Sequence, residues 1–162
     1  MSGSCHYVPV LRWKQAERLA LSHLNDVDKE GMTPLVELPP RYFDDVAVQE
    51  FDASVVEIAA DLSTSWGGRP VFVDLSSVPT IGGTHHPVTT FSLTARRYGL
   101  TSILVTGLTR PANFQRAVAA GGATSGAGVA RLTLCGAGDP CRTNGPHAGT
   151  MNSIPFDAVG LL

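Results

Sequence analysis

The sequence contains no long apolar run and no concentration of charge of one sign. No apolar stretch approaches the roughly 20 residues that a membrane-spanning helix needs. The formal net charge is −2 and the pI is about 6.2, and there is no basic patch of the kind that holds a phosphate backbone. The first residues lack the basic segment followed by an apolar one that marks a secretory signal. These absences predict a cytoplasmic protein whose partner is neither a membrane nor a nucleic acid.

Cysteine is also scarce. The three cysteines are Cys5, Cys135 and Cys141, and an odd number without framework spacing predicts free thiols in a reducing compartment. Cys135, Cys141 and His147 offer a metal site as the alternative, but no fourth ligand follows at a suitable spacing. We therefore favour free thiols, and the sequence identifies neither a metal nor another cofactor.

What the sequence does contain is a repeated short apolar run, rich in valine, isoleucine and leucine. Most of these runs carry a polar residue near the C-terminal end. Five runs predict strands: Tyr7–Lys14, Thr33–Leu38, Arg69–Leu75, Ser102–Leu108 and Gly128–Leu132. Stretches that can form helices lie between them, which is the pattern of an α/β protein with a parallel sheet and crossover helices. The chain has 162 residues, of which 43% are hydrophobic, so it is long enough for one domain with its own core.

Apolar residues at helical spacing predict the helices between these strands. The first helix is expected to bury Ala16, Leu19, Ala20, Leu24 and Val27. The second has the clearest stripe, formed by Phe51, Val55, Ile58, Ala59 and Leu62. The last two are expected to bury Phe91, Ala95 and Tyr98, and then Phe114, Ala117 and Val118. Gly99 is expected to end the third helix and Gly121-Gly122 the fourth, with residues 121–128 as a linker.

The repeated units predict two regions of different character. Residues 1–132 are expected to form a partial TIM-barrel-like parallel sheet of about five strands, with an open doubly wound sheet as the alternative. Residues 133–162 lose the repeat, because Cys135 to Ser153 has glycines and prolines but no apolar stripe. A sixth unit is therefore interrupted, and we expect this region to be a truncated or disrupted continuation. An exposed sheet edge on such a fragment would favour self-association.

Alternation along the strands predicts a group of charges at one end of the sheet. One face of most strands is apolar and is expected to carry the helices, whereas the other face ends in a polar residue. The residues expected to converge at the C-terminal rim are Lys14, Glu37, Asp74, Thr106 and Arg131, with Arg12 one layer deeper. Barrel enzymes place their chemistry at this rim.

Two interpretations of these charges remain open. Lys14, Glu37, Asp74 and Arg131 can serve as catalytic residues in general acid–base chemistry, or the carboxylates can hold a divalent metal. The same charges can equally form an internal ion-pair network that catalyses nothing.

A long polar loop over residues 76–87 contains the adjacent histidines His85 and His86. Such a pair can bind a metal or shuttle a proton. We favour the simpler interpretation, a solvated loop.

The opening of the chain resembles a known family. The segments Tyr7-Val-Pro-Val-Leu-Arg-Trp-Lys-Gln-Ala-Glu17 and Thr33-Pro-Leu-Val-Glu-Leu-Pro-Pro40 look like the start of the beta-family proteins, named after a protein of bacteriophage T4. The likeness continues through Val71-Phe-Val-Asp-Leu75 and extends to Arg131. The opening motif is fairly specific, whereas the later strands are generic.

The resemblance implies an intracellular phage or bacterial protein with the fold expected above. It puts weight on Lys14, Glu17, Glu37 and Asp74 and implies no defined activity. Three functions stay open: a beta-family protein of undefined activity, an acid–base or metal-assisted enzyme acting on a small polar or anionic substrate at the rim, and a non-catalytic phage or host interaction module.

Overall fold

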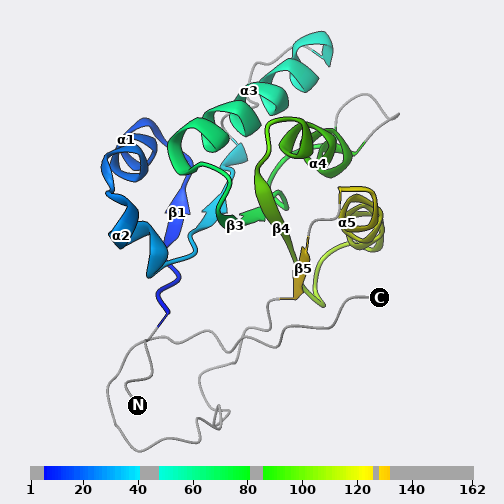
Figure 1. The fold of residues 1–162 in the computed structure, drawn as a ribbon. Coiled ribbons are helices and arrows are strands. Elements are labelled where there is room, and N and C mark those ends of the chain that lie inside the picture. The colour runs from blue at the N-terminus through cyan, green and yellow to red at the C-terminus, as the bar shows by residue number, and fades with distance from the viewer. Residues whose placement is uncertain (1–5, 41–47, 81–85, 126–127, 132–162) are drawn as a thin grey trace, which may run out of the picture.

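The computed structural model of the chain describes residues 6–40, 48–80, 86–125 and 128–131. The strands are β1 (Val10–Arg12), β2 (Leu35–Glu37), β3 (Pro70–Asp74), β4 (Thr101–Thr106) and β5 (Gly128–Arg131). The helices are α1 (Gln15–His23), α2 (Asp26–Glu30), α3 (Val48–Trp66), α4 (Pro87–Arg97) and α5 (Ala112–Ser125). The predicted α/β class with alternating βα units is confirmed (Figure 1). None of the helices in these residue ranges is both long and apolar enough to cross a membrane.

The sheet has the strand order β1-β2-β3-β4-β5, and every neighbouring pair is parallel. Crossovers between parallel strands are right-handed, so an order without reversal puts every crossover helix on the same face. Figure 1 shows the helices in an arc along the sheet. A doubly wound sheet reverses its strand order to cover both faces. The described strands contain no such reversal, so the doubly wound alternative is not supported.

The face beneath the helices is the main core. Val36, Val71 and Val73 are buried there against side chains from α1, α3, α4 and α5. The stripe predicted for α3 is confirmed at Val55, Ile58, Ala59 and Leu62, all of them buried. Burying one such aliphatic side chain contributes about 1.5–3 kcal/mol, which is why the apolar pattern determines the layers.

The stripe predicted for the first helix is wrong at most of its positions, although Leu24 is partly buried and packs against the main core. Leu19 is 51% exposed and Val27 is 77% exposed, whereas Leu21 is buried. Asn25 breaks the predicted helix in two, because its side chain accepts a hydrogen bond from the Asp28 N–H at 2.9 Å and so caps a new helix, α2. The two helices have different axes, so residues on either side of Asn25 do not share a face.

The core face of α4 is confirmed at Phe91 and Ala95, which are buried. Tyr98 is 45% exposed, so its assignment to that face is wrong. It is the C-cap residue of the helix, where the chain turns away from the core. Gly99 follows with a φ of +69°, a left-handed conformation that suits glycine and stops the helix as predicted.

Helix α5 does not end at Gly121-Gly122 but continues to Ser125, so the predicted helix end is wrong and the predicted linker is in part helical. Gly121 is buried where α5 meets α4, and a Cβ there would lie 2.7 Å from Ser92 Oγ. The glycine therefore permits close packing of two helices instead of terminating one.

The second face of the sheet carries a smaller apolar cluster, formed by Leu35, Phe72 and Val105. The register of β3 and β4 aligns Val73 with Leu104. The alternation predicted for β4 is therefore wrong by one residue: Leu104 belongs to the main core and Val105 to the second face. Three consecutive residues near the middle of this strand are apolar, so its sequence does not show which of them face the helices and which face the other side.

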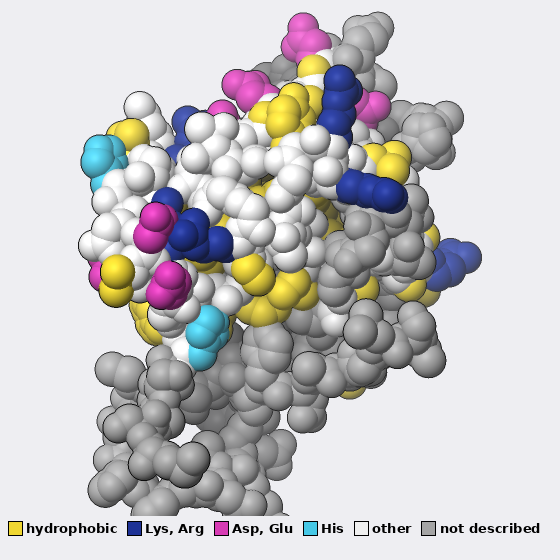
Figure 2. Space-filling view, viewed as in Figure 1, with side chains coloured by type: hydrophobic (Ala, Val, Ile, Leu, Met, Phe, Trp, Pro, Cys, Tyr) yellow, Lys and Arg dark blue, Asp and Glu magenta, His cyan; other side chains and the backbone are white. Residues whose placement is uncertain are grey.

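Charged side chains of both signs are interspersed on the face shown in Figure 2. Two ion pairs tie distant parts of the chain together. Arg18 of α1 pairs with Asp61 of α3, and Arg69 pairs with Asp26 at 2.8 Å. Exposed pairs of this kind contribute little to stability, so the buried apolar contacts hold the helices on the sheet.

Candidate functional site

Three charged residues lie in register at the C-terminal ends of β1, β2 and β3. In the strand register, Arg12 lies opposite Glu37 and Glu37 lies opposite Asp74. Neighbouring strands are about 4.8 Å apart. The three residues share the second face of the sheet, because Asp74 lies two residues beyond Phe72. Arg12 is therefore level with the carboxylates and not a layer deeper, and Lys14 lies beyond the end of its strand.

Asp74 is the buried member of this row, with a side chain 9% exposed. Its Oδ1 accepts a hydrogen bond from the Ser76 N–H at 2.8 Å. Its Oδ2 accepts one from Nη2 of Arg110 at 2.8 Å. Both oxygens are thus engaged, and Asp74 ties the end of β3 to the loop that follows β4.

Arg110 is a site residue that the strand pattern does not predict. It lies in the loop between β4 and α5, and its carbonyl accepts a hydrogen bond from Nε2 of Gln115 at 2.7 Å. The strand alternation does not extend to this loop. A usable signal is nevertheless present, because loops that follow parallel strands gather at the same rim. A cation just after β4 is thereby placed near a carboxylate at the end of β3.

The ion pair between Arg12 and Glu37 is looser. Arg12 Nε lies 3.9 Å from Glu37 Oε2, and the side chains are 70% and 44% exposed. The separation exceeds a hydrogen bond, and water screens the attraction. Both side chains are therefore available to a ligand.

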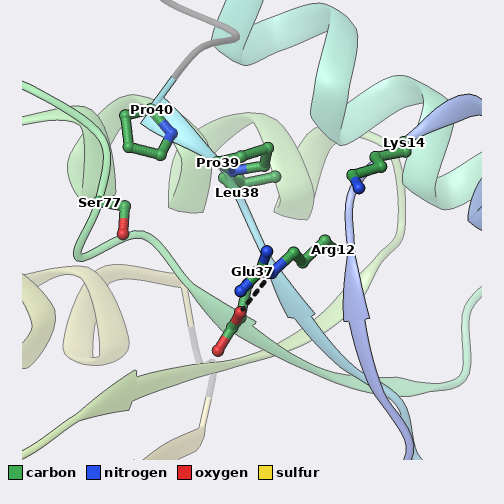
Figure 3. A pocket seen from close by; sticks show the side chains of 7 residues that line it. All are labelled: Arg12, Lys14, Glu37, Leu38, Pro39, Pro40 and Ser77. Carbon is green, nitrogen blue, oxygen red and sulfur yellow. Dashed lines mark ion pairs between the residues drawn. The ribbon is translucent and has the colours of Figure 1, made fainter.

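A cleft of about 470 Å³ lies beside this pair. Its lining residues are Arg12, Lys14, Glu37, Leu38, Pro39, Pro40 and Ser77. Figure 3 shows Arg12 and Glu37 leaning toward each other, with Lys14 and Ser77 on opposite sides of Leu38 and Pro39. The cleft thus brings together Lys14 and Glu37, two of the predicted site residues.

Lys14 is also the N-cap residue of α1, and its side chain makes no capping hydrogen bond. The first-turn N–H groups of the helix therefore lack a side-chain acceptor from the cap. In the same turn, Oε2 of Glu17 is buried and has no hydrogen-bond partner.

Thr106 and Arg131 lie differently from the three residues in the row. Thr106 is two residues beyond Leu104, which belongs to the main core, so Thr106 does not share a face with Asp74. The register pairs Arg131 with Thr106. The Arg131 side chain is outside the part that the structure describes, and its catalytic role stays a prediction.

His86 has a structural role as the N-cap of α4. Its Nδ1 accepts a hydrogen bond from the Val88 N–H at 3.3 Å, and its ring meets Phe114 edge-on with centroids 5.5 Å apart. Burial lowers the pKa of His86 below its ordinary value of 6.5. His85, the other histidine of the predicted pair, lies outside the described residues.

In the described ranges, no group of three or more His, Cys, Asp or Glu residues is placed to hold a metal ion. A metal at Glu37 and Asp74 would have to compete with the two hydrogen bonds that Asp74 accepts. Cys135, Cys141 and His147, which the sequence offers as a metal site only as the alternative to free thiols, lie outside the described residues, as does Cys5.

Fold and site together define an α/β protein of repeated βα units with a charged cleft at the C-terminal ends of its strands. In a comparison with models of known families, residues 7–134 match the family described as Beta protein. The match covers most of the chain, so the protein belongs to the Beta protein family, as its opening segments predict. The match brings no defined biochemical activity with it. Comparisons with curated proteins and with solved structures found no match.

Proposed function

We propose that the protein binds a small anionic ligand in the cleft beside β1 and β2, and that Glu37 acts there as a general acid or base. The cleft itself carries the proposal, because Arg12, Lys14 and Glu37 line a volume of about 470 Å³. Small-molecule sites commonly measure roughly 300–1,000 Å³.

Arg12 and Lys14 supply positive charge to this cleft. A guanidinium group offers a planar fork to a carboxylate or phosphate, and an ammonium group adds a compact charge. The hydroxyl group of Ser77 can donate a further hydrogen bond. These groups favour an anion over a neutral ligand.

Glu37 and Asp74 have different proposed roles. Glu37 is 44% exposed, and its ion pair is longer than a hydrogen bond, so it can exchange protons with a bound molecule. Asp74 has both oxygens engaged, so we assign it a positioning role: it holds the turn that presents Ser77 to the cleft. Arg131 is left out of this proposal because the strand register places it beside Thr106, which does not share a face with Asp74.

We further propose that the described sheet is part of a barrel-like sheet in a cytoplasmic phage or bacterial protein. The unreversed strand order supports the barrel-like arrangement, as does the apolar cluster on the second face. In a barrel that second face is the interior, and the charged strand ends form the rim at which such folds carry their sites.

Titration of the purified protein with inorganic phosphate and with acetate tests the binding proposal, with calorimetry or NMR as the readout. Lys14→Met is expected to weaken binding about tenfold, because a charge-assisted contact is lost. Arg97→Met is the matched control, since it removes the same charge from the exposed end of α4. The cleft is not an anion site if the wild-type protein shows no saturable binding, or if both variants lose affinity equally.

A further inference from the structure

We infer that the ligand of the cleft is a zwitterion of the α-amino acid class, with its anionic group at Arg12 and Lys14 and its ammonium group at Glu37. This inference rests on the proposed anion-binding function of the same cleft. A plain anion leaves one of the three lining charges without a partner: when it engages Arg12, it draws that guanidinium away from Glu37.

The pair between Arg12 and Glu37 is easily parted. The two side chains are 3.9 Å apart and 70% and 44% exposed, so no hydrogen bond at normal distance has to be broken. Each side chain can therefore take its own partner from one bound molecule. Figure 3 shows both side chains on the same side of the strand ends, with the dashed line marking their present contact.

The neighbouring Asp74 favours a cationic partner for Glu37. The two carboxylates are register partners on adjacent strands, and like charges directly opposite each other are unfavourable. Arg110 neutralises Asp74 at 2.8 Å. Among the described residues, Arg12 is the one cation in an ion pair with Glu37. When an anionic group binds Arg12, the ammonium group of the same ligand can replace Arg12 as the ion-pair partner of Glu37.

The shape of the cleft fits an amino acid. Adjacent strands lie about 4.8 Å apart, so one small molecule can reach partners on both. The carboxylate and ammonium groups of an α-amino acid are attached to one carbon, so a single small molecule presents both charges to these neighbouring side chains. Pro39 and Pro40 form an apolar wall between the polar ends of the cleft, and this wall can accept an aliphatic side chain.

Matched ligand pairs test the inference. Leucine and 4-methylpentanoate have the same carbon skeleton and differ by the amino group, and glycine and acetate form a second such pair without a side chain. The wild-type protein is expected to bind at least one amino acid about tenfold more tightly than its des-amino partner, which corresponds to about 1.4 kcal/mol. Glu37→Gln is expected to remove this preference, and the des-amino acid is expected to bind at least as tightly as to the wild type because Arg12 no longer has an ion-pair partner to leave.

The outcomes separate the two proposals. If the des-amino acids bind as tightly as the amino acids, the zwitterion inference is overturned and the anion site stands. Equal binding of leucine and 2-hydroxy-4-methylpentanoate also overturns it, because a neutral donor then suffices at Glu37. If neither phosphate nor any of the acids binds, both proposals fail. A thermal melt of Glu37→Gln that matches the wild-type melt shows that the variant is folded.

Discussion

Glu37 and Asp74 are neighbours in the strand register, yet their surroundings give them different tasks. Asp74 is 9% exposed and accepts hydrogen bonds from Ser76 and Arg110. Glu37 is 44% exposed and has Arg12 3.9 Å away. Hydrogen bonds to a buried charge contribute more to stability than an exposed ion pair does. At the residue scale, the two carboxylates should therefore separate into a structural group and a ligand-facing group.

Asp74→Asn is expected to lower the free energy of unfolding by about 2 kcal/mol, because it weakens two charge-assisted hydrogen bonds and leaves Arg110 unpaired. Glu37→Gln is expected to change it by less than about 0.5 kcal/mol, because its pair is exposed. Denaturant unfolding of both variants measures the difference. Arg110→Met should cost about as much as Asp74→Asn, and the double variant little more. Equal losses at Glu37 and Asp74 would instead favour an internal ion-pair network.

His86 is expected to make the stability depend on pH. Burial lowers the pKa of His86 below 6.5 in the folded chain, so the unfolded chain binds the proton more readily. Its contribution is present above pH 6.5 and is lost as the pH falls through the lowered pKa. Protonation of Nδ1 also removes the acceptor for the Val88 N–H. Between about pH 7.5 and about pH 5, wild type should lose more unfolding free energy than His86→Asn, which keeps a capping side chain. Equal losses would show that His86 titrates as it does in the unfolded chain.

The sequence predicts Lys14 and Glu37 at one site, and both line the cleft. It misplaces Arg12 and does not include Arg110, for the same physical reason. Alternation shows which residues of one strand share a face, but it does not give the register between strands. The register puts Arg12 level with Glu37, and the fold of a loop brings Arg110 to Asp74. Both facts depend on long-range pairing, which a local pattern does not contain.

At the scale of single elements, Gly121 decides how closely α5 packs on α4. A Cβ at this position would meet Ser92 Oγ at 2.7 Å, Leu104 Cδ1 at 3.2 Å and Val88 Cγ1 at 3.3 Å. Alanine favours a helix over glycine by up to about 1 kcal/mol, but overpacking costs about 1–3 kcal/mol. Gly121→Ala is therefore expected to be destabilising by about 1 kcal/mol in thermal or denaturant unfolding.

Ser92→Ala in the Gly121→Ala background should recover part of this loss, because Ser92 Oγ is the nearest atom to the added methyl group. Ser92→Ala alone removes the hydrogen bond that the hydroxyl donates to the Val88 carbonyl at 2.7 Å and serves as the control. A stabilised Gly121→Ala variant would mean that α4 and α5 lie further apart in solution.

Sequence pattern works best for the elements whose apolar stripe is long. The stripe predicted for helix α3 is correct, since four of its residues are buried. The first helix is not, because the Asn25 cap divides it and a pattern of spacing does not register a cap. Helix α5 continues beyond its glycines because packing against α4 outweighs the low helix propensity of glycine. Local propensity thus fails where a cap or a tertiary contact decides.

At the scale of the whole molecule, the repeated βα units predict the parallel sheet, and the strand order β1-β2-β3-β4-β5 gives that sheet one helical face. Given that order, right-handed crossovers between successive strands place the helices on one face; the sequence repetition predicts the parallel sheet but leaves its strand order open. The second face, where the charged row lies, is harder to predict because its apolar cluster is small and the phase of β4 is hidden.

The edge of the sheet gives a test of the barrel-like arrangement. Among the described strands, β1 pairs with β2 alone, and the Trp13 N–H donates to the Glu37 carbonyl at 2.9 Å. Successive N–H groups of a strand point to opposite edges, so the Arg12 N–H faces away from β2. Hydrogen exchange followed by NMR should therefore be slow at Trp13, and it should be fast at Arg12 if no further strand pairs with this edge. Protection of Arg12 that equals that of Trp13 would mean that another strand lies on this edge.

The concentration dependence of this protection shows where such a strand comes from. If the protection is independent of protein concentration, the strand belongs to the same chain and the sheet continues toward closure. If it rises with concentration, the edge pairs between molecules.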